Sequence, residues 1–168
     1  TCALPIYYDE NLLNDYKDII SYKKPQLIIF HLLGQHFQYS LRCKSNMKKF
    51  GIKDYKRMDL TDKEKQTIAD YDNATLYNDF VLNKIVEQFR NKDAIIVYLS
   101  DHGEDCYGND VNMAGRLTEV EQINLKKYHE EFEIPFWIWC SPIYKQKHRK
   151  IFTETLMARN NKFMTDDL

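Results

Sequence analysis

Three short apolar runs stand out along the chain, at residues 26–33, 94–99 and 134–140. Each is too short for a buried helix and is rich in β-branched or aromatic side chains, which favours β-strands. The run at 94–99 has no polar face, so we expect it to be covered on both sides, as strands of a parallel sheet are. The third run has Pro135 at its start, where a missing backbone donor is tolerated.

Helical patterns separate these runs. Apolar residues recur at helical spacing in 9–22, and Thr61 with Glu64 forms a capping box that opens a pattern reaching about residue 91. Further helices are expected at 119–131 and 142–158. Strands that alternate with helices predict an α/β layered fold with a largely parallel sheet.

Length and composition narrow the class of protein. The 168 residues suit one domain, and the net charge of −1 gives no support for nucleic-acid binding. No apolar run reaches the length of a membrane span, and no signal peptide opens the chain. Because the first residue is Thr1 rather than Met, we expect a piece of a longer protein.

Four cysteines are scattered through the sequence without a C-x-x-C pair, which argues against a zinc ribbon or a thioredoxin motif. Disulfides and free thiols both remain open for them. They are Cys2, Cys43, Cys106 and Cys140.

The run at 94–99 ends in the polar sequence S-D-H-G-E at 100–104. Ligands bind at the carboxyl ends of strands in α/β sheets, and Gly103 permits the turn that would let Asp101 and His102 converge. A carboxylate, an imidazole and the second carboxylate of Glu104 make a plausible half of a zinc site. The alternative is an ordinary strand-to-loop junction capped by polar side chains.

Histidines also accompany the first apolar run. His31 lies inside it and is either a core histidine or a ligand, whereas His36 lies beyond it, where a loop could carry it to a ligand. The first half of the long helix is polar at 70–73. That half is either kinked or next to a polar site.

The order of these motifs resembles a known family. H-L-L-G-Q-H at 31–36, Y-D-N-A-T-L-Y-N-D at 71–79, S-D-H-G-E at 100–104 and I-P-F-W-I-W at 134–139 are similar to the catalytic domain of bacterial phosphoethanolamine transferases. These enzymes belong to the alkaline phosphatase and sulfatase superfamily. The resemblance implies an alkaline-phosphatase-like three-layer sandwich, of which residues 1–168 would be an incomplete, C-terminal part.

The resemblance also implies roles for particular residues. Asp101 and His102 match the family's zinc ligands. Glu104 matches a family position too, and we expect it to contact the ligand side chains rather than the zinc itself. His36 matches a histidine near the transferred phosphate or a second zinc. The family's nucleophilic threonine and first glutamate ligand have no counterpart before residue 26, where Thr1 is the only threonine.

A second departure falls at N-M-A-G-R, residues 112–116, where many members have a histidine and this chain has Arg116 or nothing in its place. By resemblance, the full-length protein is a zinc enzyme of the bacterial inner membrane with its catalytic domain in the periplasm. It moves phosphoethanolamine from phosphatidylethanolamine to lipid A or another envelope glycan. The 168 residues alone are expected to be inactive and weakly loaded with zinc.

Three alternatives remain open at this point: a sulfatase, a phosphoglycerol transferase of the same superfamily, or a non-catalytic domain that retains the fold. The Y-D-N-x-x-x-Y-x-D pattern at 71–79 favours the phosphoethanolamine branch. Polar residues at two strand ends argue against a decayed site, because buried charges without partners are costly.

Overall fold

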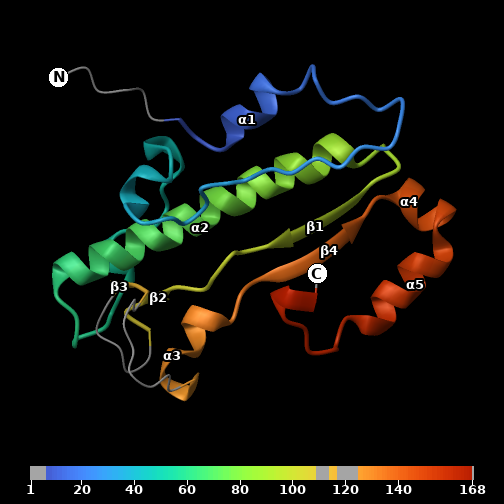
Figure 1. Cartoon of the computed structure of the whole chain (residues 1–168). Helices are drawn as coiled ribbons and strands as arrows, with labels where there is room; N and C mark the ends of the chain where they lie inside the picture. The colour runs from blue at the N-terminus through green and yellow to red at the C-terminus, as the bar shows by residue number, and fades with distance from the viewer. Residues whose placement is uncertain (1–6, 109–113, 117–124, 168) are drawn as a thin grey trace.

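The computed structural model describes residues 7–108, 114–116 and 125–167 (Figure 1). Its helices are α1 (Glu10–Asp15), α2 (Asp62–Phe89), α3 (Leu125–Phe132), α4 (Pro142–Lys147) and α5 (Arg149–Ala158). Its strands are β1 (Ile95–Leu99), β2 (Asp105–Cys106), β3 (Ala114–Gly115) and β4 (Phe136–Cys140). Short 3-10 helices lie at Tyr39–Leu41, Ser45–Met47, Ile52–Asp54 and Thr165–Asp167. None of the helices in the described ranges is long and apolar enough to span a membrane.

Helix α2 is the longest element, with 28 residues, and extends about 42 Å through the middle of the molecule (Figure 1). The predicted capping box is confirmed: the Thr61 hydroxyl accepts from Glu64 N, and Thr61 N donates to the Glu64 carboxylate at 2.7 Å. The helix continues unbroken to Phe89, so the polar residues at 70–73 do not mark a kink.

The second half of α2 carries the main hydrophobic core. Tyr77, Val81, Ile85 and Phe89 recur every four residues on one face of the helix and are all buried, together with Cys43. The face packs on β1 and β4 through partly buried side chains that include Ile96 and Trp139. The three described cysteines, at 43, 106 and 140, are free thiols, and Cys2 lies outside the described residues.

The predicted parallel sheet is wrong for the described residues. β1 and β4 form where strands were expected, but they pair antiparallel, with Val97 opposite Ile138. Gly103 N donates to Glu131 O at 3.0 Å, which holds the end of α3 beside the end of β1. β4 therefore starts at the end where β1 finishes.

The expected cover on both faces of the sheet is not present either. Ile96 and Tyr98 face α2 and are half-buried, whereas Ile95 and Val97 are 40% and 45% exposed on the opposite face. A three-layer sandwich is therefore not formed by the described part of the chain, which places a helix on one face of this two-stranded sheet.

The run at 26–33 does not form a strand in the described structure. Its side chains nevertheless alternate as in a strand: Ile28, Phe30 and Leu32 pack against the core, while Leu27 and Ile29 are 88% and 80% exposed. No described segment forms backbone hydrogen bonds to this run, so it belongs to neither of the two sheets of the described structure.

The first predicted helix, 9–22, is also shorter than expected, because α1 ends at Asp15. Ile19, four residues further on, is 71% exposed, and in the second half of the predicted stripe only Ile20 packs against the core. A helix this short depends on such packing. The last predicted helix forms as two, α4 and α5, separated at His148.

A buried side chain links α2 to the segment before it. Asn73 is fully buried; its carbonyl accepts from Lys49 N at 2.7 Å and Phe50 N at 3.0 Å, and its amide donates to Phe50 O at 2.9 Å. Asn73→Ala should lower the free energy of unfolding by about 2–4 kcal/mol, because it removes three hydrogen bonds between the fully buried Asn73 side chain and the backbone of Lys49 and Phe50.

Urea unfolding would measure this change. Thr153→Ala is the control, because the Thr153 hydroxyl bonds only to the backbone of its own exposed turn. Equal stability of the two variants would contradict the role given to Asn73.

Candidate metal centre

The turn after β1 arranges Asp101 and His102 side by side. Ser100 Oγ donates to His102 O at 2.7 Å, which closes the turn. His102 Nδ1 lies 2.6 Å from Gly103 O. A carbonyl oxygen only accepts, so Nδ1 carries the proton and Nε2 presents a lone pair. Nε2 lies 3.7 Å from Asp101 Oδ2.

This geometry fits two ligands of one zinc ion. Zinc binds histidine nitrogen and carboxylate oxygen at about 2.0–2.2 Å, so two donors of a tetrahedral site lie roughly 3.4 Å apart. The separation between Asp101 and His102 is close to that value. Histidines that bind metals also commonly donate their other ring N–H to a backbone carbonyl, as His102 does. Asp101 is 87% exposed and so can turn toward an ion.

The described residues supply only part of a metal site. Within 7–108, 114–116 and 125–167, no group of three or more histidine, cysteine, aspartate or glutamate side chains is placed to hold a metal ion. Asp101 and His102 are thus a pair of donors rather than a complete coordination sphere.

Gly103 fixes the position of this pair. Besides the hydrogen bond from Gly103 N to Glu131 O, the backbone of α3 approaches so closely that a Cβ at position 103 would lie 2.0 Å from Glu130 O. Only glycine allows this approach, which anchors the turn against α3.

Glu104 lies among the other polar groups of the site. Burial raises the pKa of Glu104 above its ordinary value, while the Tyr39 hydroxyl and the nearby His102, His36 and Arg116 lower it. The structure therefore brings His36 and Arg116, from distant parts of the sequence, to the carboxylate that follows the Asp-His pair. Glu104 thus interacts with one member of the ligand pair, His102, and with two groups that can carry positive charge, His36 and Arg116.

His36 reaches the site through a turn at the end of the extended run. Gly34 has φ +51°, a left-handed conformation that glycine adopts without strain, and His36 N donates to Leu33 O at 2.9 Å. The Asp9 carboxylate accepts from Gly34 N at 2.8 Å and holds the turn. The His36 side chain is exposed, and His31 is exposed as well, so His31 is not a core histidine.

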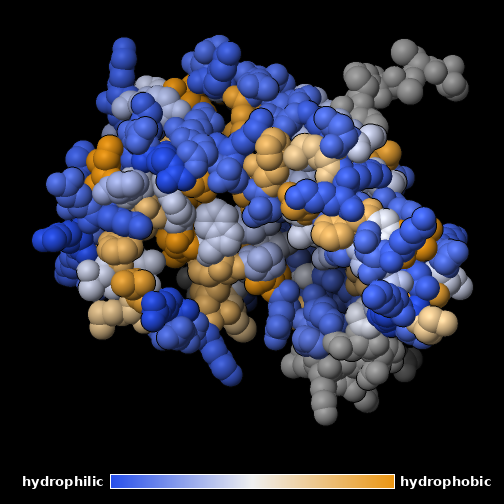
Figure 2. All heavy atoms as spheres, turned by 180° about the vertical axis from the view of Figure 1, so that it is seen from behind, coloured by the Kyte–Doolittle hydropathy of each residue, from blue (hydrophilic) through white to orange (hydrophobic). Residues whose placement is uncertain are grey.

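The predicted residues all line one groove of about 1850 Å³ between the 20–37 segment and β1. Arg116 lines it too, at the position where the family pattern has a histidine; residues 112 and 113 of that stretch, like Thr1, lie outside the described residues. In Figure 2, hydrophobic residues reach the surface around a hollow near the middle of the back of the molecule.

Sequence reasoning missed two tyrosines beside Glu104. Tyr39 is buried, and its hydroxyl lies near the Glu104 carboxylate. The two groups do not meet the distance and angle criteria of a hydrogen bond. Burial, and then the charge of Glu104, raise the pKa of Tyr71 to about 12. The polar first half of α2 was the signal for Tyr71, because the helix is continuous there and Tyr71 lines the same groove as Glu104.

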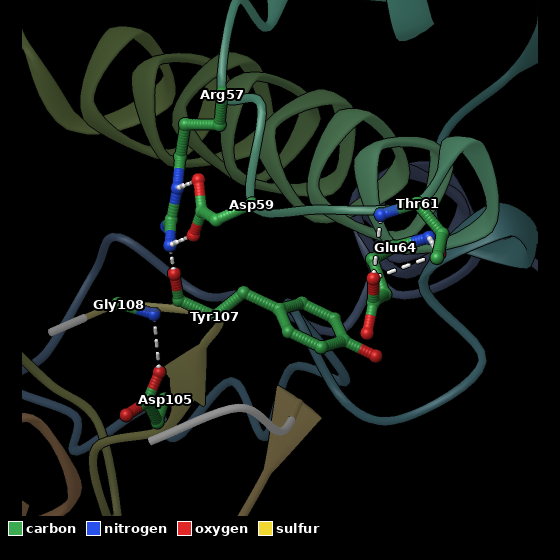
Figure 3. Close-up of polar contacts among 7 residues, drawn as sticks. All are labelled: Arg57, Asp59, Thr61, Glu64, Asp105, Tyr107 and Gly108. Atoms are coloured by element: carbon green, nitrogen blue, oxygen red, sulfur yellow. Dashed lines mark hydrogen bonds and ion pairs between the residues drawn. The ribbon is translucent and has the colours of Figure 1, made fainter. Parts of the chain in front are cut away.

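Sequence reasoning also missed Arg57, which lies in the segment before α2. Its guanidinium pairs with Asp59 at 2.5 Å and donates to Tyr107 O (Figure 3). Gly108 N in turn donates to the Asp105 carboxylate at 2.7 Å, and Asp105 is buried (Figure 3). These contacts hold the chain that follows Glu104 against the segment before α2.

Comparisons with known proteins identify the family. The sulfatase family profile matches residues 1–166, so the chain belongs to the sulfatase family. Phosphoethanolamine transferase EptC of Escherichia coli K12 is 33% identical over 151 residues, which are 88% of this chain and 25% of that protein. Phosphoethanolamine transferase EptA of Helicobacter pylori is 32% identical over 166 residues, which are 95% of this chain and 30% of that protein.

Solved structures give the same result for the fold. The C-terminal periplasmic domain of E. coli EptC, crystallised as a complex with Zn, superposes with a TM-score of 0.73 at 34% identity. The match covers 88% of this chain and 41% of that one. The soluble domain of lipooligosaccharide phosphoethanolamine transferase A from Neisseria meningitidis, at 22% identity and a TM-score of 0.70, shares the fold. The chain thus spans between a quarter and a half of the length of these relatives.

Proposed function

We propose that this chain is part of the catalytic domain of a zinc-dependent phosphoethanolamine transferase. The observation that carries the proposal is the Asp101–His102 pair, spaced for one ion, with the His102 tautomer set by Gly103 O. The similarity to phosphoethanolamine transferases EptC and EptA supports the reaction class.

Within this proposal, Asp101 and His102 would hold the zinc. The bound ion would stabilise negative charge on phosphoryl oxygens and lower the pKa of a coordinated hydroxyl. The Gly103 carbonyl keeps Nε2 of His102 free for coordination. His36 and Arg116 would contact the phosphate of the transferred group or, for His36, a second zinc. Glu104 would orient the side chains of His102, His36 and Arg116 through its carboxylate, without binding the zinc. We assign no nucleophile among the described residues.

The donor in this proposal is phosphatidylethanolamine, and the acceptor is lipid A or another glycan of the bacterial envelope. The domain would lie in the periplasm, as the matching domain of E. coli EptC is named, and would be attached to the inner membrane by a segment outside these 168 residues. The test is transfer of phosphoethanolamine from a labelled phosphatidylethanolamine by the intact protein. Hydrolysis of a sulfate ester or transfer of phosphoglycerol in its place would refute the proposal.

The zinc affinity of the 168-residue chain gives a direct prediction. Catalytic zinc sites use three protein ligands and structural sites four, whereas the described residues offer two. The isolated chain is therefore expected to lose zinc on gel filtration, with metal content measured by atomic absorption and an Asp101→Ala chain as the baseline. A stoichiometric zinc that stays bound would show that further ligands have been overlooked.

His36 gives a second prediction, in the intact enzyme. His36→Ala should slow transfer by about 100-fold while zinc remains bound, because its assigned contact is with the phosphate rather than with the ion held by Asp101 and His102. His31→Ala is the matched control, since His31 is exposed beside the same groove. Loss of zinc from the His36 variant would instead make His36 a ligand.

A further inference from the structure

The turn that carries His36 is held by two side chains of α2. Gln35, the residue before His36, donates from its side-chain amide to Thr75 Oγ1 at 3.1 Å. The oxygen of the same amide accepts from the Asn78 side chain at 3.5 Å. Thr75 and Asn78 are three residues apart in α2 and so lie on one face of the helix. Both ends of the Gln35 amide are therefore fixed on α2.

Asn78 also reaches the strand that leads to the candidate metal centre. Its side-chain amide donates to the Tyr98 hydroxyl at 3.0 Å, and Asn78 is only 5% exposed, so the bond is shielded from water. Tyr98 lies in β1, three residues before Asp101, and its ring stacks on Trp137 with the centroids 5.2 Å apart. Gln35, Asn78 and Tyr98 together form a polar bridge between the turn and the strand.

The chain after His36 is held from a different direction. Arg42 donates from Nε to His36 O and from Nη2 to Phe37 O, both at 3.2 Å. Arg42 lies outside α2, so these two bonds fix the backbone after His36 independently of the bridge. The bridge is therefore the contact that fixes the residue before His36.

We propose that Asn78 is a positioning residue, and that the bridge holds His36 at a distance from the ligand pair at which both contact the same phosphate. The inference rests on the proposed function, which assigns the phosphate contact to His36. Glu104 interacts with both His36 and His102, so the two histidines lie in one neighbourhood. A misplacement of about 1 Å in such a contact costs about 100-fold in rate, so a bond that fixes the turn matters to catalysis without touching the substrate.

Tyr98→Phe in the intact enzyme tests the bridge, because it removes only the hydroxyl that accepts from Asn78. We expect kcat to fall by about tenfold, with zinc retained and with KM for phosphatidylethanolamine changed by less than about twofold, since positioning acts mainly on the transition state. Asn78→Leu removes both bonds of Asn78 at similar volume and should be at least as slow. Tyr22→Phe is the matched control, because the Tyr22 hydroxyl also accepts from a side-chain amide, that of Gln88, at 3.3 Å.

A second background separates positioning from a general loosening of the fold. If the bridge acts through His36, Tyr98→Phe should slow the His36→Ala enzyme by less than about twofold, because the group that it positions is already missing. A loosened fold would slow both backgrounds by the same factor. Equal tenfold effects in the two backgrounds would overturn the proposal, and so would full kcat in both the Tyr98 and the Asn78 variants.

Amide hydrogen exchange of the same proteins gives a readout that does not need transfer. His36 N closes the turn by donating to Leu33 O at 2.9 Å, so its exchange should be about tenfold faster in Tyr98→Phe and unchanged in Tyr22→Phe. The Arg42 amide, on the far side of His36, is the internal reference. Unchanged His36 exchange in Tyr98→Phe would refute the bridge alone, whereas a protein that transfers no phosphoethanolamine in its unaltered form would refute the proposed function.

Discussion

Replacing Asp101 or His102 by alanine in the intact enzyme is expected to reduce phosphoethanolamine transfer by about 1,000-fold and to release the zinc. A metal ion supplies several kcal/mol of charge stabilisation, and about 1.4 kcal/mol corresponds to each tenfold in rate. Each variant leaves a single donor where two lie 3.7 Å apart. Transfer from labelled phosphatidylethanolamine and zinc content should be measured on the same preparations.

Asp18→Ala is the control for this experiment, because Asp18 is exposed and lies outside the groove. Full activity in the Asp101→Ala enzyme would refute the assignment of the ligand pair. Loss of activity with zinc retained would show that Asp101 acts on the substrate and does not bind the ion.

Gly103→Ala should destabilise the chain strongly, with a loss of about 3 kcal/mol in the free energy of unfolding. The added Cβ would meet Glu130 O at 2.0 Å and Glu133 O at 2.8 Å, and both atoms belong to the backbone and cannot rotate away. The turn and α3 would have to separate, which breaks the hydrogen bond from Gly103 N to Glu131 O.

Gly51→Ala is the matched control, because a Cβ at that position meets nothing within 4 Å. Urea unfolding of the 168-residue chain would measure both variants, and the difference corresponds to a fall of roughly 6–12 °C in Tm for a domain of this size. If Gly103→Ala is as stable as Gly51→Ala, the close packing of the turn on α3 is refuted.

Local signals in the sequence were sufficient for the elements that depend on local interactions. The capping box at Thr61 and the stripe that ends at Phe89 predicted α2, and two apolar runs predicted β1 and β4. Strand direction was not predictable in the same way. The antiparallel direction is set by the contact between Gly103 and Glu131, residues 28 positions apart. The apolar pattern of a strand does not depend on whether the strand pairs parallel or antiparallel.

For the candidate site too, contacts between sequence neighbours were predictable and contacts between distant segments were not. Asp101 and His102 are neighbours in sequence, so their proximity could be predicted, together with the turn that Gly103 permits. The contacts that set the environment of Glu104 join it to Tyr39 and Tyr71, and Arg57 reaches Tyr107 from 50 residues away. Such contacts between distant segments carry no periodic signal, and their residue types are equally common on solvated surfaces.

The length of α2 has a consequence for how the chain folds during synthesis. With 28 residues and a capped start, α2 is well above the roughly 12–15 residues below which a helix is marginal in water. The strands that cover its apolar face come later in the sequence, and β4 ends at Cys140. At about 5–20 residues per second, a ribosome needs several seconds to deliver the roughly 50 residues in between. For that interval the part of this face that β1 and β4 cover stays exposed and is available to chaperones, whereas Ile28, Phe30 and Leu32, which precede α2, can already pack on the rest.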